Sequence, residues 1–169
     1  TKEYLEELIS LNSRLDALGM KCEELLMNEG YDAYAQTKKR LGTDFGEFNS
    51  FELPHKTIAT RAGLGWIGRN GMLVNPRLGT FTFIGTLITS LDLKPNKEMG
   101  NRCGTCRRCV DACPTNAIHN KTIDARRCLS YQTIEKRGDI DNELIEVAKN
   151  TLYGCDRCQL ACPWNRFAH

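Results

Sequence analysis

The chain has 169 residues, of which 41% are hydrophobic and 26% are charged, and its 23 Lys and Arg against 21 Asp and Glu leave a formal net charge of +2. This composition is typical of a globular domain, and so balanced a charge does not indicate a nucleic-acid or membrane surface. The longest run without a charge, residues 78–91, is too short and too polar for a membrane span of about 20 apolar residues. Because the sequence begins at Thr1 rather than Met, we also expect a missing N-terminal segment.

The first predicted element is a helix that runs to about Met27. Apolar residues recur in steps of four and three from Tyr4 to Leu25, which places them on one face of a helix, and Asn28 and Gly30 end it. Cys22 lies on this apolar face, so we expect it to be buried as a small hydrophobic residue.

The remaining elements are short and separated by turns. In chain order we predict a strand at Tyr31–Thr37, a loop at Gly42–Ser50, a helix at Lys56–Ala62, strands at Gly71–Asn75 and Thr80–Thr89, and helices at Asp124–Arg137 and Asp141–Asn150. The polar segment Asp92–Gly100 marks a boundary between residues 1–94 and residues 95–169. The predicted fold class is α+β, with an N-terminal helix and a small sheet followed by a loop-rich part with short helices.

Nine cysteines are the strongest feature of the sequence. An odd number excludes complete internal pairing, and the chain is larger than small disulfide-rich secreted domains. Four of the thiols, Cys103, Cys106, Cys109 and Cys113, match the ferredoxin pattern C-x2-C-x2-C-x3-C-P. In two-cluster ferredoxins the fourth cysteine of this pattern binds the neighbouring cluster, so a second set of ligands is expected.

The sequence contains such a set. Cys155, Cys158 and Cys162 form C-x2-C-x3-C-P, and Cys128 is available upstream. We predict two [4Fe-4S] clusters in a crossover arrangement, with Cys103, Cys106, Cys109 and Cys162 on one cluster and Cys113, Cys128, Cys155 and Cys158 on the other. A local arrangement that exchanges Cys113 with Cys162 stays open, and zinc is the competing metal.

Iron–sulfur clusters transfer single electrons and indicate a reducing, cytoplasmic setting. The electrons need a destination, which we expect in the first hundred residues. Gly63, Gly65 and Gly68 match G-x-G-x-x-G, but a helix precedes them and a strand follows, which is the reverse of the dinucleotide-binding order. His55 and His119 have no metal-like spacing, so we expect them on the surface or in turns.

Four segments, GLGWIGRN, NRCGTCRRCVDACPTNAI, DARRCLSYQTIEKRGDI and LYGCDRCQLACPWNRFA, resemble the epoxyqueuosine reductase family over about Ala59 to Ala168. Members are cobalamin-dependent enzymes with two [4Fe-4S] clusters that perform the last step of queuosine synthesis on tRNA. The resemblance implies a ferredoxin- or flavodoxin-like electron donor and cobalamin as the electron acceptor. It also implies a corrinoid pocket lined by Gly63, Gly65, Trp66, Gly68, Arg69 and Asn70, although the motif D-x-H-x-x-G is absent from the sequence.

Three departures from the family mark a divergent member with a changed substrate. The position of the family's proton-donating Asp holds Gln36, and an amide can offer a hydrogen bond but no proton. The connection to Ala59 is longer and includes LPHKT, and a HEAT-like C-terminal extension is absent, which argues against tRNA as a partner. The alternative function is a ferredoxin-like electron-transfer protein or subunit that binds no corrinoid and catalyses nothing itself.

Overall fold

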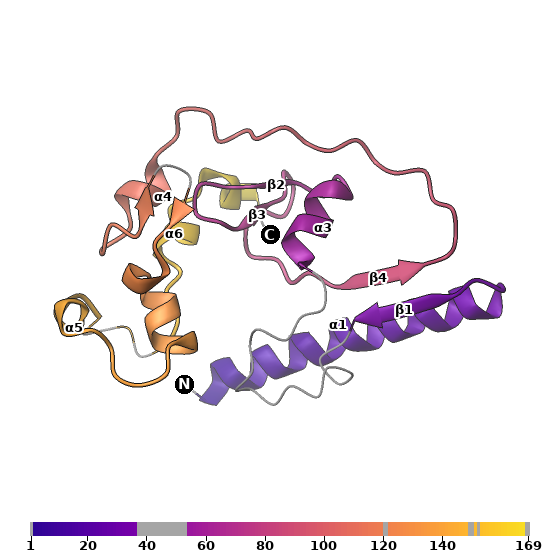
Figure 1. Ribbon diagram of the computed structural model, residues 1–169, viewed down its shortest axis with the longest axis horizontal. Coiled ribbons are helices and arrows are strands. Elements are labelled where there is room, and N and C mark those ends of the chain that lie inside the picture. Colours follow the sequence, from indigo (N-terminus) through magenta and orange to yellow (C-terminus); the bar gives the residue numbers. More distant parts are fainter. Residues whose placement is uncertain (1, 37–53, 120–121, 149–150, 152, 168–169) are drawn as a thin grey trace. The chain divides into compact units, whose positions relative to one another are not determined.

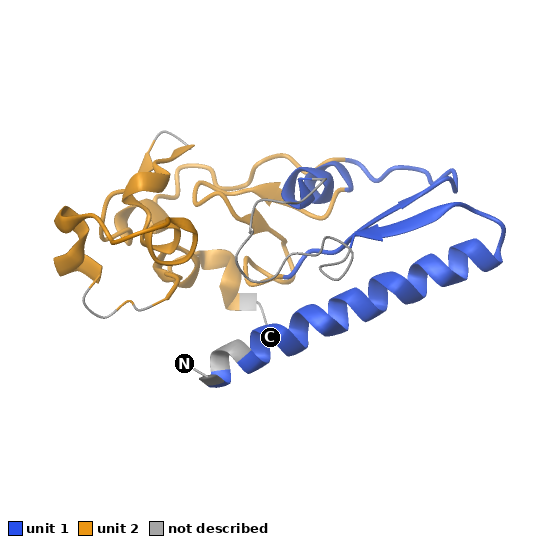
Figure 2. Ribbon diagram, turned by 60° about the horizontal axis from the view of Figure 1, so that its bottom comes forward, with its two compact units in different colours: residues 1–62, 83–97 blue, residues 63–82, 98–169 orange. Residues whose placement is uncertain are grey.

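The computed structural model describes residues 2–36, 54–119, 122–148, 151 and 153–167 (Figure 1). The loop expected at Gly42–Ser50 lies outside them. The chain packs as two compact units, of which unit 1 contains residues 1–62 and 83–97 and unit 2 contains residues 63–82 and 98–169 (Figure 2). The fold class is α+β, as expected. Unlike the expected division between residues 94 and 95, this one groups residues 63–82 with the cysteine-rich part.

Unit 1 consists of a long helix against a two-stranded ribbon. The predicted first helix, strand and second helix are confirmed as α1 (Lys2–Asn28), β1 (Ala33–Gln36) and α3 (His55–Arg61). Strand β1 pairs antiparallel with β4 (Thr86–Thr89), with Gln36 opposite Thr86. Both views show α1 running alongside this ribbon (Figures 1 and 2).

The packing of α1 depends on one small residue and one buried carboxylate. A Cβ atom at Gly19 would lie 3.3 Å from the Cβ of Ala35, so the missing side chain lets the helix approach β1. The Glu23 side chain is buried and accepts a hydrogen bond from the Ala35 N–H at 2.9 Å. Because the face with Gly19 and Glu23 meets the ribbon, Cys22 is exposed, and the prediction that Cys22 is buried is wrong.

Unit 2 is built from short elements and turns. Its strands are β2 (Trp66–Ile67), β3 (Leu73–Val74), β5 (Ile118–His119) and β6 (Thr122–Ile123), and its helices are α4 (Arg108–Asp111), α5 (Asn142–Ala148) and α6 (Arg157–Leu160). The strands form two antiparallel hairpins, β2–β3 and β5–β6. A small core of Leu129, Leu144 and Ala148 packs with Cys155. No helix in the described part of the chain is long and apolar enough to cross a membrane.

Two predicted elements are shorter than expected. The helix predicted at Asp124–Arg137 is a 3-10 turn at Ala125–Arg127 and a π turn at Tyr131–Glu135, separated at Cys128 by an extended backbone. The strand predicted at Thr80–Thr89 begins only at Thr86. Further upstream, the Thr80 N–H donates to the Asn165 side chain at 2.6 Å instead of to a neighbouring strand.

Candidate metal centre

Two short helices position four of the cysteines in the same way. The segments RCVDACPTN and DRCQLACPWN share the pattern C-x-x-A-C-P-x-N, and each forms a single helical turn, α4 or α6. Cys109 and Cys158 lie within these helices, and the N–H groups of Cys113 and Cys162 close the turn that follows, at 3.1 and 2.9 Å. The repeat therefore places a second cysteine directly after each helix, and α4 and α6 pack against each other.

The first group of cysteines surrounds a cavity in unit 2. This cavity has a volume of about 110 Å³, and its thiol lining consists of Cys103, Cys106, Cys109 and Cys162. Burial raises the pKa of Cys109, and the charges of Cys103 and Cys162 raise it further. Four thiols that repel one another's negative charge need a cation or a cationic cluster between them to be ionised together.

The predicted crossover arrangement assigns Cys113, Cys128, Cys155 and Cys158 to a second group. Burial raises the pKa of Cys158 to about 12, with further contributions from the charges of Cys155, Cys128, Cys109 and Cys113. Burial also opposes ionisation of Cys113, but hydrogen bonds from Thr115, Ala117 and Ile118 outweigh it and lower the pKa of this thiol. One of these, from the Ala117 N–H to the Cys113 sulfur, is 3.2 Å long.

The first group contains the four cysteines that the predicted crossover arrangement assigns to one cluster, and the sequence-distant Cys162 lies with the first three cysteines of the ferredoxin pattern. The charges of both Cys109 and Cys113 act on Cys158, so the membership of the second group stays a prediction. Within the described residues, no three His, Cys, Asp or Glu side chains are arranged around a single metal ion. Ligation by each cysteine stays a prediction.

The glycine-rich segment forms one wall of the four-cysteine cavity. Gly68, Arg69 and Asn70 line it. The segment is joined to the first cysteine loop by a hydrogen bond from the Arg69 Nη2 to the Gly104 carbonyl at 2.7 Å and by one from Asn101 Nδ2 to the Ile67 carbonyl at 2.9 Å. The order of helix, glycines and strand confirms that this segment is not a dinucleotide-binding fingerprint.

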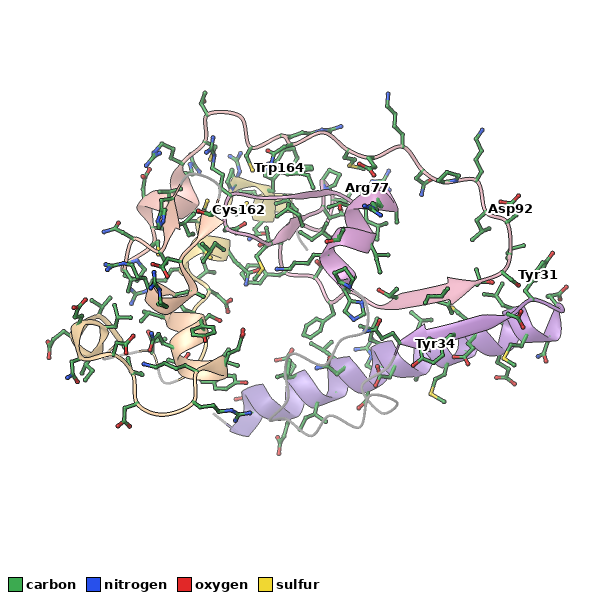
Figure 3. All side chains as sticks on the ribbon, viewed as in Figure 1. Tyr31, Tyr34, Arg77, Asp92, Cys162 and Trp164 are labelled. Atoms are coloured by element: carbon green, nitrogen blue, oxygen red, sulfur yellow. The ribbon has the colours of Figure 1, made fainter. Side chains whose placement is uncertain are left out.

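Gly65 and Trp66 of this segment pack against other residues of unit 2. A Cβ atom at Gly65 would lie 2.1 Å from the Val74 carbonyl oxygen, so β3 occupies the space beside this glycine. The Trp66 ring is 2% exposed and meets the Trp164 ring edge-on at 4.9 Å. Figure 3 shows Trp164 in the same region as Cys162. Gly65 and Trp66 therefore offer little open surface to a corrinoid.

The sequence reasoning did not identify several other residues that line the cavity. These are Val74, Arg102, Pro163 and Trp164. Arg102 and Pro163 each stand next to a cysteine in the sequence, and Trp164 follows Pro163. This adjacency is the signal that could have identified them. Val74 reaches the cavity only because the β2–β3 hairpin folds back on itself.

A separate cavity of about 270 Å³ lies within unit 1. Gln36, His55 and Thr86 contribute polar atoms to its lining, and Leu15 and Phe83 contribute apolar surface. His55 Nδ1 and Thr86 Oγ1 form a hydrogen bond of 2.5 Å, and burial lowers the pKa of His55. Gln36 is 7% exposed, and neither polar atom of its side chain has a hydrogen-bond partner among the described residues.

Known proteins match both the cysteine-rich part and most of the whole chain. The 4Fe-4S double cluster binding domain family matches residues 102–165. An epoxyqueuosine reductase from Aliivibrio fischeri is 39% identical over 159 residues, which are 94% of this chain and 39% of that protein. The chain thus spans about two fifths of the length of the curated relatives it matches.

Solved structures agree with these sequence matches. The epoxyqueuosine reductase of Streptococcus thermophilus superimposes with a TM-score of 0.74 at 36% identity, covering 95% of this chain and 40% of that one. A second epoxyqueuosine reductase, crystallised with an epoxyqueuosine-modified tRNA stem loop, gives a TM-score of 0.75 at 30% identity, covering 93% and 38%. The chain accordingly carries a domain that binds two [4Fe-4S] clusters.

Proposed function

Because the chain is related in sequence and fold to the epoxyqueuosine reductases over the two fifths of their length that it spans, we propose that it is part of an iron–sulfur oxidoreductase. In this proposal its two [4Fe-4S] clusters receive single electrons from a ferredoxin- or flavodoxin-like donor and pass them to a site of substrate reduction. The observation that carries the proposal is the cavity that Cys103, Cys106, Cys109 and Cys162 surround.

Ligation follows the crossover arrangement. Cys162, on the turn after α6, completes the set of Cys103, Cys106 and Cys109, and Cys113, on the turn after α4, completes the set of Cys128, Cys155 and Cys158. The grouping of thiols around one cavity and the mutual influence of their charges support this assignment. The packing of α4 against α6 also supports it, because each helix then carries ligands of both clusters.

The cavity of unit 1 is the candidate for the site of substrate reduction. Removal of an epoxide oxygen to leave an alkene consumes two electrons and two protons and releases water. The Gln36 amide can hold an oxygen by a hydrogen bond but cannot protonate it. His55 and Asp16 line the same cavity and carry titratable side chains, and burial lowers the pKa of His55. We therefore expect a substrate other than that of the relatives, and a tRNA substrate is not part of the proposal.

Cobalamin enters the proposal only as a cofactor to be tested. When bound, it supplies a cobalt centre that can take up electrons for a reduction. The segment assigned to it from sequence lies partly against the four-cysteine cavity and is closed by β3 at Gly65. We assign it no step in the reaction.

Spectroscopy of the anaerobically purified chain distinguishes two hypotheses: that the chain is part of an enzyme, or that it is an electron carrier. The protein is incubated with hydroxocobalamin, passed through a gel-filtration column and then reduced. We expect corrinoid absorption bands that elute with the protein and change on reduction, beside the broad iron–sulfur absorption. If the iron–sulfur absorption is present and no corrinoid elutes with the protein at saturating cobalamin, the chain is an electron-transfer segment without a corrinoid.

A further inference from the structure

Two side chains in the wall of the four-cysteine cavity carry N–H groups that the protein leaves unused. The Nδ2 of Asn70 and the Nε of Arg69 are buried and have no hydrogen-bond partner among the described residues. Asn70 is 4% exposed, so water does not replace the missing partner. A buried donor without an acceptor is unfavourable and rare in folded proteins, and it indicates an acceptor that the protein chain does not itself provide.

The orientation of both side chains is set by their other polar atoms. The Oδ1 of Asn70 accepts a hydrogen bond from the Met72 N–H at 3.3 Å, which leaves only its Nδ2 without a partner. The Nη2 of Arg69 donates to the Gly104 carbonyl, within the loop that carries Cys103 and Cys106. One end of each side chain is thus held by the backbone, and both residues line the cavity of the four thiols.

We propose that Asn70 and Arg69 donate N–H···S hydrogen bonds to the [4Fe-4S] cluster held by Cys103, Cys106, Cys109 and Cys162, and thereby hold its reduction potential above the value it would otherwise have. This inference rests on the proposed ligation of that cluster. Reduction adds one electron, and the extra negative charge is shared with the sulfur atoms. Hydrogen-bond donors stabilise the more negative state more strongly, so they raise the reduction potential.

The second cluster is expected to be independent of these two residues. Its proposed ligand Cys113 accepts a hydrogen bond from the Ala117 backbone, and Thr115 lies beside the same sulfur. Asn70 and Arg69 line the cavity of the first set, together with Cys103, Cys106, Cys109 and Cys162. The two clusters of one molecule therefore provide an internal control.

The substitutions Asn70→Leu and Arg69→Lys test the proposal. Leucine removes the amide donor at similar volume, and lysine removes the Nε–H while it keeps the positive charge. Potentials of both clusters are measured by redox titration with dithionite and mediators, followed by electron paramagnetic resonance. Each substitution should lower the reduction potential of one cluster and leave that of the other unchanged. Arg77→Lys is the matched control, because Arg77 is exposed in the same unit and does not line the cavity.

A measurement on the unsubstituted protein tests the hydrogen bond from Asn70 even if a variant fails to fold or to bind its clusters. Protein labelled with 15N at the asparagine side-chain amides is reduced and examined by pulsed electron paramagnetic resonance. We expect a 15N coupling to the reduced cluster, since Asn70 is the sole asparagine in the described lining of the cavity.

Outcomes of the two experiments separate this inference from the proposed function. Iron retained at about eight atoms per chain, with neither potential moved and no asparagine 15N coupling, overturns the hydrogen bonds and leaves the double-cluster function intact. Equal shifts of both potentials would also overturn them, because they would indicate a general effect of charge or stability. Absence of iron from the unsubstituted protein overturns both ideas.

Discussion

Gln36 is the residue that we expect to separate this chain from its relatives. Its position on β1 opposite Thr86 brings it near His55, which is bonded to Thr86. The amide is 7% exposed and carries a donor and an acceptor that the described protein does not use. A buried carboxylic acid at this point would have a raised pKa and would stay protonated near neutral pH. The amide instead offers hydrogen bonds without a proton.

Replacing Gln36 by an acid tests the expectation that this chain lacks the proton donor of its relatives at this position. Gln36→Asp should raise the reduction of an epoxyqueuosine-containing tRNA stem loop by about 10²-fold or more, since general acids contribute about 10²–10⁴-fold. The product is measured by mass spectrometry of the digested RNA, with electrons supplied by dithionite. Gln36→Asn is the control, because it shortens the side chain equally without adding an acid. Equal activity of the two variants would show that the substrate, and not the acid alone, has changed.

At the scale of elements, the repeated unit C-x-x-A-C-P-x-N organises the centre. Each copy makes one helical turn and ends in a cysteine on the turn that follows, and in the proposed crossover this cysteine binds the cluster of the other copy. Asn165 of the second copy also holds Thr80, through a 3.0 Å hydrogen bond from its Nδ2 to the Thr80 Oγ1. The repeat thus connects residues 63–82 to the cysteine-rich part of unit 2.

A Cys113→Ser variant distinguishes the crossover from the local arrangement. In the crossover, loss of this thiol damages the cluster of Cys128, Cys155 and Cys158, and iron should fall from about eight to about four atoms per chain. The electron paramagnetic resonance spectrum of the reduced variant should then match that of Cys158→Ser. A spectrum that matches Cys103→Ser would instead favour the local arrangement.

At the scale of the whole molecule, unit 1 and unit 2 differ in the internal packing that stabilises each of them. Unit 1 has a 27-residue helix against a ribbon, whereas the described residues of unit 2 contain a small core around Leu129, Leu144 and Ala148 and short turns. We therefore expect cluster binding to supply much of the folding free energy of unit 2, as metal binding does in other small metal-containing domains.

Removal of the clusters should accordingly affect the units unequally. After oxidation with ferricyanide and chelation of the iron, hydrogen–deuterium exchange should rise across residues 98–148 and 153–167, while α1 keeps its protection. Mass spectrometry of peptides from treated and mock-treated protein measures the difference. Unchanged exchange in unit 2 after complete loss of iron would contradict this account.

Several structural features could be predicted because they depend on neighbouring residues. The bounds of α1, β1 and α3 follow from local periodicity and from the residues that end each element. The exposure of Cys22 could not be predicted, since it depends on the approach of Gly19 to Ala35 across the unit. The short turns between Asp124 and Arg137 could not be predicted from the sequence either. The extended backbone at Cys128 interrupts a segment whose sequence pattern predicts one helix.

The sequence by itself determined the kind of centre that this protein carries. Gaps of two and three residues bring thiols onto adjacent turns of the backbone, and this local geometry indicates iron–sulfur clusters in any surrounding fold. Only the tertiary structure decided that Cys162 joins Cys103 and that Asn70 and Arg69 face the same cavity. These contacts join residues distant in sequence, and their formation depends on packing between α4 and α6 and on hydrogen bonds between loops, which no local pattern encodes.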